Sequence, residues 1–86
     1  PNSTVEFDPW KIHPNPFNNH FILSCPGLNS HITLTISSIG GARIWKRTFA
    51  PSSEINVVPD IKIPQGIYIL SIETNNFAAS RKLYKR

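Results

Sequence analysis

The chain has 86 residues, which is enough for one small domain with a single core. Nine Lys and Arg residues exceed five Asp and Glu residues, which gives a formal net charge of +4. The excess is local, because the final residues include Arg81, Lys82, Lys85 and Arg86. Such a basic end can contact phosphate or anionic lipid headgroups, although a solvent-exposed final strand is the simpler interpretation.

The single cysteine excludes an internal disulfide. Cys25 lies in an alternating stretch with Phe21 and Leu23, which favours a buried, unpaired thiol with a structural role. The sequence holds no apolar segment of a signal peptide and no run near the roughly 20 residues of a membrane helix. Because it begins at Pro1 and contains no Met, we expect a piece of a longer protein.

The amino-terminal part predicts a linker, a short strand and a kink. Residues 1–9 carry two prolines and no sustained periodicity, which is typical of a linker with a short extended piece at 5–7. A short strand is expected at 10–13. Pro14–Asn15–Pro16 then predicts a rigid kink at a sheet edge, because proline lacks an amide donor and missing donors cost least there. Residues 17–19, Phe-Asn-Asn, are typical of a turn.

The middle of the chain alternates between apolar and polar residues, which predicts strands at 20–25 and 31–38. Gly40–Gly41 predicts a tight hairpin with two positive-φ positions, and residues 43–49 are expected to form the return strand. Two adjacent apolar residues break the alternation of this strand, so either a bulge or a half-exposed Trp45 is expected. The side chains expected to face the core are Phe21, Leu23, Cys25, Ile32, Leu34 and Ile36.

The longest clean strand is expected at 66–74, after a short strand at 54–58. Between them, Ile61 and Ile63 are expected to hold a small loop against the core. The strand at 66–74 follows a turn glycine and is rich in β-branched side chains, so we place it at the centre of a sheet. Its core face carries Tyr68, Leu70, Ile72 and Thr74.

The chain ends in a predicted hairpin and a final strand. Both residues of Asn75–Asn76 tolerate left-handed φ in the turn, and residues 77–84 form the expected last strand. Seven strands at roughly ten-residue spacing, without helical periodicity, predict an all-β antiparallel sandwich.

Residue clusters that would indicate catalysis or metal binding are missing from the sequence. The three histidines are far apart and share no metal-ligand spacing, and the five carboxylates show no close pairing. Gly40–Gly41 lacks the following helix that a phosphate-binding glycine loop needs. We therefore expect no enzyme activity, no metal and no cofactor.

Aromatic residues near cations leave a binding module as an alternative. Trp10, Trp45 and Tyr84 can stack on sugars, as in a fibronectin-like carbohydrate- or protein-binding module of an exported protein. Packing in the core or at a sheet edge is the simpler interpretation of these side chains. A nucleic-acid binder needs a basic stripe, whereas the cations here are mostly terminal, so no nucleic-acid partner is expected.

Four short motifs occur in order along the chain. They are Pro14–Asn15–Pro16 followed by Phe21 and Leu23, the glycine hairpin at 38–44, the strand start at 64–70 and the basic end at 81–85. Together they resemble the C-terminal sorting domain (type A) of type IX secretion cargo, over residues 10–86. The hairpin departs from the family pattern, because it carries Gly-Gly-Ala-Arg where a single glycine before Arg or Lys is commoner.

This resemblance implies an immunoglobulin-like sandwich that acts as a folded secretion signal in a Gram-negative bacterium. A cargo domain upstream in the same chain crosses the inner membrane, and the sorting domain directs it from the periplasm through the outer-membrane translocon with its shuttle proteins. A sortase-like cysteine protease usually removes the domain at the cell surface, and the linker at 1–9 offers an accessible cleavage region. The cargo is often linked to anionic lipopolysaccharide.

The resemblance also implies which residues the translocon recognises, and we expect the last strand and its cations to be what the machinery reads. Gly66 and Tyr68 are expected to shape the strand beside it. The full set of motif residues is Pro14, Asn15, Pro16, Gly40, Gly41, Arg43, Gly66, Tyr68, Arg81, Lys82, Leu83 and Lys85.

Overall fold

The computed structural model describes residues 11–26, 28–75 and 78–86. These residues form seven strands and no helix: β1 (Lys11–His13), β2 (Phe21–Ser24), β3 (Ile32–Ser38), β4 (Arg43–Phe49), β5 (Glu54–Val57), β6 (Gly66–Glu73) and β7 (Ala78–Lys85). The expected linker at 1–9, with its extended piece at 5–7, lies outside the described residues, as do Trp10, Asn76 and Phe77. No helix long and apolar enough to cross a membrane occurs in the described part of the chain.

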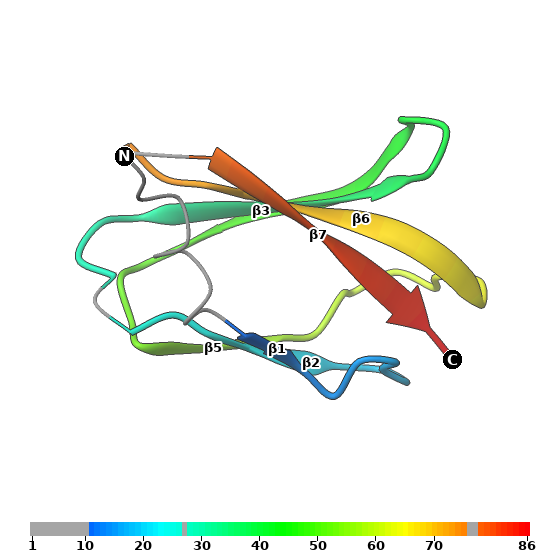
Figure 1. The fold of residues 1–86 in the computed structure, drawn as a ribbon, viewed down its shortest axis with the longest axis horizontal. Coiled ribbons are helices and arrows are strands. Elements are labelled where there is room, and N and C mark those ends of the chain that lie inside the picture. Colours follow the sequence, from blue (N-terminus) through cyan, green and yellow to red (C-terminus); the bar gives the residue numbers. More distant parts are fainter. Residues whose placement is uncertain (1–10, 27, 76–77) are drawn as a thin grey trace, which may run out of the picture.

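The strands form two antiparallel sheets that face each other as two layers (Figure 1). One sheet has the order β1-β2-β5 and the other has the order β4-β3-β6-β7. Strand β4 pairs with β3 in the same sheet as β6 and β7, as in immunoglobulin-like sandwiches. The prediction of an immunoglobulin-like sandwich is therefore confirmed, and β6 lies inside its sheet between β3 and β7.

The core lies between the layers and is built from the inward residue of each alternating pair. Every core position that the alternation predicts in β2, β3 and β6 is buried: Phe21, Leu23, Ile32, Leu34 and Ile36 at 0% exposure, Leu70 at 0%, Ile72 at 2% and Tyr68 at 9%. β5 adds Ile55 and Val57, and β7 adds Leu83. Because the side chains of a strand alternate between faces, each strand contributes only half of its residues to this core.

Cys25 continues the inward row of β2 and is fully buried and free, as expected. Its Sγ donates a hydrogen bond to the carbonyl oxygen of Ser52 at 3.1 Å. Burial raises the pKa of the Cys25 thiol, which disfavours the reactive thiolate. The residue therefore acts as a small core side chain.

The hairpin between β3 and β4 differs from the expected two-glycine turn. Only Gly41 has a positive φ, at 100°, so the prediction of two such positions is wrong for Gly40. Ser38 closes the turn instead: its carbonyl accepts from the Gly41 N–H at 2.9 Å and its Oγ accepts from the Ala42 N–H at 3.1 Å. The expected bulge is present, because the pairing shifts between Ile36 and Ser37, and it leaves Trp45 only 6% exposed.

Candidate functional site

Strand β7 forms one edge of the four-stranded sheet and pairs with β6 along its whole length. Leu83 is fully buried, and Arg81 and Lys85, on the same face of the strand, are half-buried. Lys82 lies on the opposite face and is exposed. The cations expected as one cluster therefore divide between the two faces of β7.

The carboxyl end of β7 is covered on its outer edge by Asn15 and Phe17, which we call the clamp. The Asn15 amide behaves like the backbone of a neighbouring strand, because its Oδ1 accepts from the Tyr84 N–H at 2.8 Å and its Nδ2 donates to the Lys82 carbonyl at 3.2 Å. The Phe17 N–H donates to the Tyr84 carbonyl at 2.9 Å, and the Phe17 carbonyl accepts from the Arg86 N–H at 2.8 Å. The Pro-Asn-Pro motif and the basic end, which the sequence presents as separate signals, are in direct contact.

The clamp also connects the two layers of the sandwich. Pro14–Asn15–Pro16 follows β1, which is an edge strand of the three-stranded sheet, so the prediction of a kink at a sheet edge is confirmed. The peptide bonds before both prolines are cis. From this edge the chain reaches β7 of the other sheet, and Figure 1 shows the carboxyl end of β7 descending toward the layer of β1 and β2.

The assignment of residues 17–19 to a simple turn is wrong for Phe17, which is 1% exposed and belongs to the core. Its ring packs edge-on against Phe21, with 5.1 Å between centroids and 69° between planes. The Lys85 Nζ lies 5.8 Å from the centre of the Phe17 ring. The sequence does hold one signal for this burial, since Phe17 has the same even spacing as the inward row of Phe21 and Leu23.

Gly66 and Tyr68 shape the start of β6 opposite the basic end. Gly66 has a φ of 154° and pairs with Lys85 across the sheet. The Tyr68 hydroxyl donates to the Pro64 carbonyl at 2.6 Å, and its ring is buried opposite Leu83. This turn therefore lies at the start of β6, directly across the sheet from the basic end of β7.

The glycine hairpin lies at the same end of the sandwich but not beside β7. Across the sheet, Arg43 of β4 pairs with Ser37 of β3, and Ile69 of β6 pairs with both Ser37 and Lys82 of β7. Strands β3 and β6 therefore lie between the two cations. Gly40 and Gly41 are exposed at the tip of this hairpin. The fold thus gathers all four sequence motifs at one end of the molecule, and it brings only two of them, the kink and the basic end, into contact.

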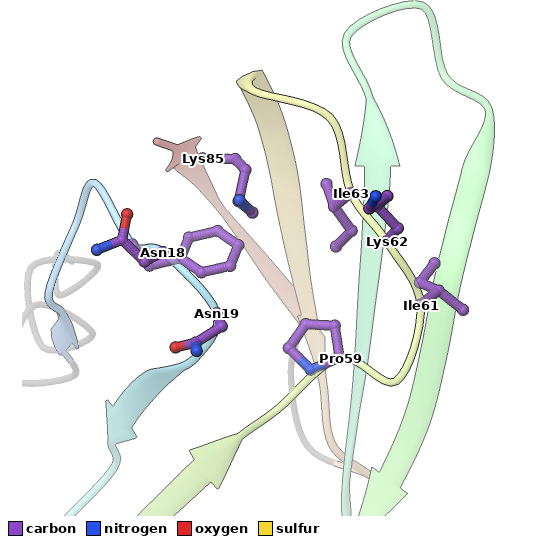
Figure 2. Close-up of a pocket in the computed structure, with 8 residues that line it drawn as sticks. Asn18, Asn19, Pro59, Ile61, Lys62, Ile63 and Lys85 are labelled. Atoms are coloured by element: carbon purple, nitrogen blue, oxygen red, sulfur yellow. The ribbon is translucent and has the colours of Figure 1, made fainter.

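A pocket of about 230 Å³ opens at this end, between residues 17–19 and the segment that connects β5 to β6 (Figure 2). The expectation that both isoleucines of this segment lie against the core is half right: Ile63 is 5% exposed, whereas Ile61 is 45% exposed. The residues that line the pocket are Phe17, Asn18, Asn19, Pro59, Ile61, Lys62, Ile63 and Lys85. Sequence reasoning did not predict this pocket.

Asp60 ties the connecting segment to β4. Its Oδ1 accepts from the Trp45 Nε1–H at 3.0 Å and its Oδ2 accepts from Arg47 Nη2 at 2.8 Å. The guanidinium of Arg47 also lies 5.6 Å from the centre of the Trp45 ring. The hydrogen bonds from Trp45, from its own backbone and from Arg47 lower the pKa of the Asp60 carboxyl. Asp60 therefore orients one wall of the pocket.

We expect Asp60→Asn to lower stability slightly at pH 7 and to have no effect in acid. A lowered folded-state pKa means that the carboxylate stabilises the fold above its unfolded-state pKa of about 3.9, and that this stabilisation is lost as pH falls through the folded-state pKa. The difference between the urea denaturation midpoints of the two proteins is expected to shrink as the pH falls below about 3.9. A series of denaturation curves from pH 7 into this acid range measures it, with the exposed Glu73→Gln as a control. A difference that stays constant with pH contradicts the prediction.

A family model described as the secretion system C-terminal sorting domain matches residues 11–86. A search for related proteins of curated function finds no match. The matched range includes every strand of both sheets and all the motif residues, so the resemblance seen in the sequence is confirmed. The chain belongs to the secretion system C-terminal sorting domain family, whose members are C-terminal signals that engage the type IX machinery and send an upstream cargo to the cell surface or the medium.

Proposed function

We propose that this domain carries its cargo from the periplasm through the type IX outer-membrane translocon, and that the translocon and its shuttle proteins read the carboxyl half of β7 together with the clamp. One observation carries this proposal: Asn15 and Phe17 hold the Lys82–Arg86 backbone from outside. They fix the position of the basic end on an otherwise open sheet edge. The clamp already bonds the outer backbone groups of Lys82, Tyr84 and Arg86, so a partner at this end reads the exposed cations, which the clamp holds in fixed positions.

The division of the cations defines their roles in this proposal. Exposed Lys82 and Arg86 offer their charge directly to an acidic partner. Half-buried Lys85 holds its ammonium group over the Phe17 ring and helps to hold the end of the strand. Gly66 and Tyr68 act on recognition indirectly, because they lie directly across the sheet from this end.

The same proposal assigns the cleavage step. A sortase-like cysteine protease cuts in the linker at 1–9 at the cell surface and separates the cargo from the sorting domain, which comprises residues 10–86. Supporting this, the family match begins at residue 11, so a cut in the linker leaves the matched residues intact. The cargo is then released or joined to lipopolysaccharide.

A sugar-binding module receives less support from the aromatic residues. Trp45, one of the expected stacking platforms, is 6% exposed, and its indole N–H is bonded to Asp60. Tyr84 is 37% exposed, on β7. Of the expected platforms, Tyr84 is therefore the one exposed in the described part of the chain, and a single ring does not make the flat aromatic platform that sugar stacking needs.

Replacing Lys82 and Lys85 by Ala tests the proposal. With a reporter that carries an export signal, the wild-type domain is expected to bring the reporter to the cell surface, and the double variant to leave it folded in the periplasm. The expected loss of stability is small, because surface substitutions change it by about 0.5 kcal/mol or less and a cation–π contact adds about 0.5–1 kcal/mol. Surface labelling and protease protection of the reporter provide the measurement.

The matched control replaces exposed lysines on other strands, Lys11 in β1 and Lys46 in β4, which removes the same charge and leaves β7 unchanged. This control is expected to reach the surface like the wild type. If both double variants lose surface delivery equally, the machinery recognises the net charge of the domain and not the β7 edge. Surface delivery at wild-type level by a chain that lacks residues 77–86 contradicts the sorting proposal altogether.

A further inference from the structure

The pocket at the motif end has an apolar floor and a polar, positively charged rim. Phe17 and Ile63 are buried beneath it, and Pro59 and the 45% exposed Ile61 form one wall. In the described part of the chain no segment covers these side chains, and large exposed apolar residues that gather around a hollow are typical of interaction sites.

The volume of about 230 Å³ sets the size of what can enter. A buried cavity of about 150 Å³ lined by Leu, Ile and Phe binds benzene, whereas drug-sized ligands use about 300–1,000 Å³. The size of this pocket therefore suits one aliphatic or aromatic side chain.

The rim selects the charge of the ligand. Figure 2 shows Asn18 and Asn19 across the pocket from Lys62, with Lys85 above the opening. No Asp or Glu is among the described residues that line it. The carboxylate of Asp60, two residues before Lys62 in the sequence, is bonded to Trp45 and Arg47 of β4.

From this geometry we propose that the pocket binds a peptide segment in which a Leu- or Phe-sized side chain is flanked by carboxylates. The apolar side chain fills the space above Phe17 and Ile63, and the carboxylates approach Lys62 and Lys85. Asn18 and Asn19 contribute neutral polar groups to the rim, and the Asn19 Oδ1 already pairs with the His20 Nδ1 at 3.2 Å. The inference goes beyond the sorting proposal. The two share Phe17 and Lys85, so the variants that test the pocket are at Ile61 and Lys62, which the sorting proposal does not use.

Titration of the isotope-labelled chain with the peptide acetyl-Ser-Asp-Leu-Asp-Ser-amide tests the inference by NMR. Saturable shifts are expected at the amides of Asn18, Asn19, Ile61 and Lys62. A peptide with Ser in place of Leu is expected to bind about tenfold more weakly or worse, which corresponds to the lost burial of one side chain. A peptide with Lys in place of both Asp residues is also expected to bind more weakly.

Two variants with matched controls localise the binding. Ile61→Ser is expected to weaken it about tenfold, whereas Ile39→Ser, at an exposed position on the β3–β4 hairpin, leaves it unchanged. Lys62→Ala is expected to weaken it about two- to fivefold, as for an exposed ion pair, whereas Lys46→Ala does not. Both pocket substitutions leave the clamp and β7 intact.

Several results overturn the inference. They are shifts centred away from the pocket, equal binding of the Leu and Ser peptides, unchanged binding by Ile61→Ser, and an equal response to inorganic phosphate alone. None of these touches the sorting proposal, because the surface delivery assay with Lys82→Ala and Lys85→Ala is read separately. If the double variant loses surface delivery and the wild-type chain does not bind the peptide, the sorting proposal stands and the proposed peptide binding by the pocket is rejected.

Discussion

Leu70→Ala is expected to lower the free energy of unfolding by about 2–5 kcal/mol, the range observed for emptying a buried leucine site. Leu70 is 0% exposed on β6, the strand that pairs with both β3 and β7. An interior strand with neighbours on both sides has little room to collapse into the vacated space. Because a domain of this size has a total stability of about 4–13 kcal/mol, the variant loses a large share of it.

Chemical denaturation followed by tryptophan fluorescence measures this loss, since Trp45 is buried in the folded state. Ile67→Ala provides the control on the same strand: Ile67 is 45% exposed, so its truncation is expected to cost about 1 kcal/mol or less. Equal costs at the two positions would show that β6 does not present one buried and one open face.

Alternation in the sequence was sufficient to predict most of the fold. In β3 and β6 the side chains switch faces at every residue, so a period-two apolar pattern leaves one register that buries the apolar row. Ile36 and Leu70 are buried and adjacent across the sheet for this reason. The bulge in β4 was predictable as well, because two adjacent apolar residues cannot both face inward on a regular strand.

Phe17, Ile61 and Gly40 show where such reasoning fails. Phe17 lies outside any strand, and it is buried through a bridge to Lys85 at the far end of the chain. Ile61 and Ile63 have the spacing of a shared face, but the segment between β5 and β6 is not a strand, so the spacing does not place them together. Gly40 was expected to have a positive φ and does not. The Ser38 side chain closes the turn instead, by accepting a hydrogen bond from the Ala42 N–H.

The candidate site was predictable as a set of residues but not as a geometry. The family resemblance indicated the kink and the basic end, and no sequence pattern indicated that an Asn15 amide pairs with a strand 67 residues later. The pocket was not predictable, because it depends on Asp60 holding one loop and on the clamp holding another. Contacts between segments that lack periodicity leave no signal in a single sequence.

Phe17→Ala is expected to lower the free energy of unfolding by about 3–5 kcal/mol, as for other buried phenylalanines. The substitution keeps the backbone bonds from Phe17 to Tyr84 and Arg86 but removes the ring that packs on Phe21 and under Lys85. The cost therefore reports on the core role of the ring, which a turn residue does not have. The adjacent exposed Asn18→Ala is the control and is expected to cost about 0.5 kcal/mol or less.

Measuring both the denaturant midpoint and the surface delivery of the same reporter fusion separates loss of recognition from loss of folding. Phe17→Ala is expected to reduce surface delivery together with stability, because the clamp and the end of β7 lose their shared support. Lys82→Ala with Lys85→Ala is expected to reduce delivery with stability nearly unchanged. If Phe17→Ala unfolds at the wild-type denaturant midpoint, the ring is not part of the core. If it is destabilised yet delivers the reporter at wild-type levels, the machinery does not require the support that the Phe17 ring gives to the end of β7.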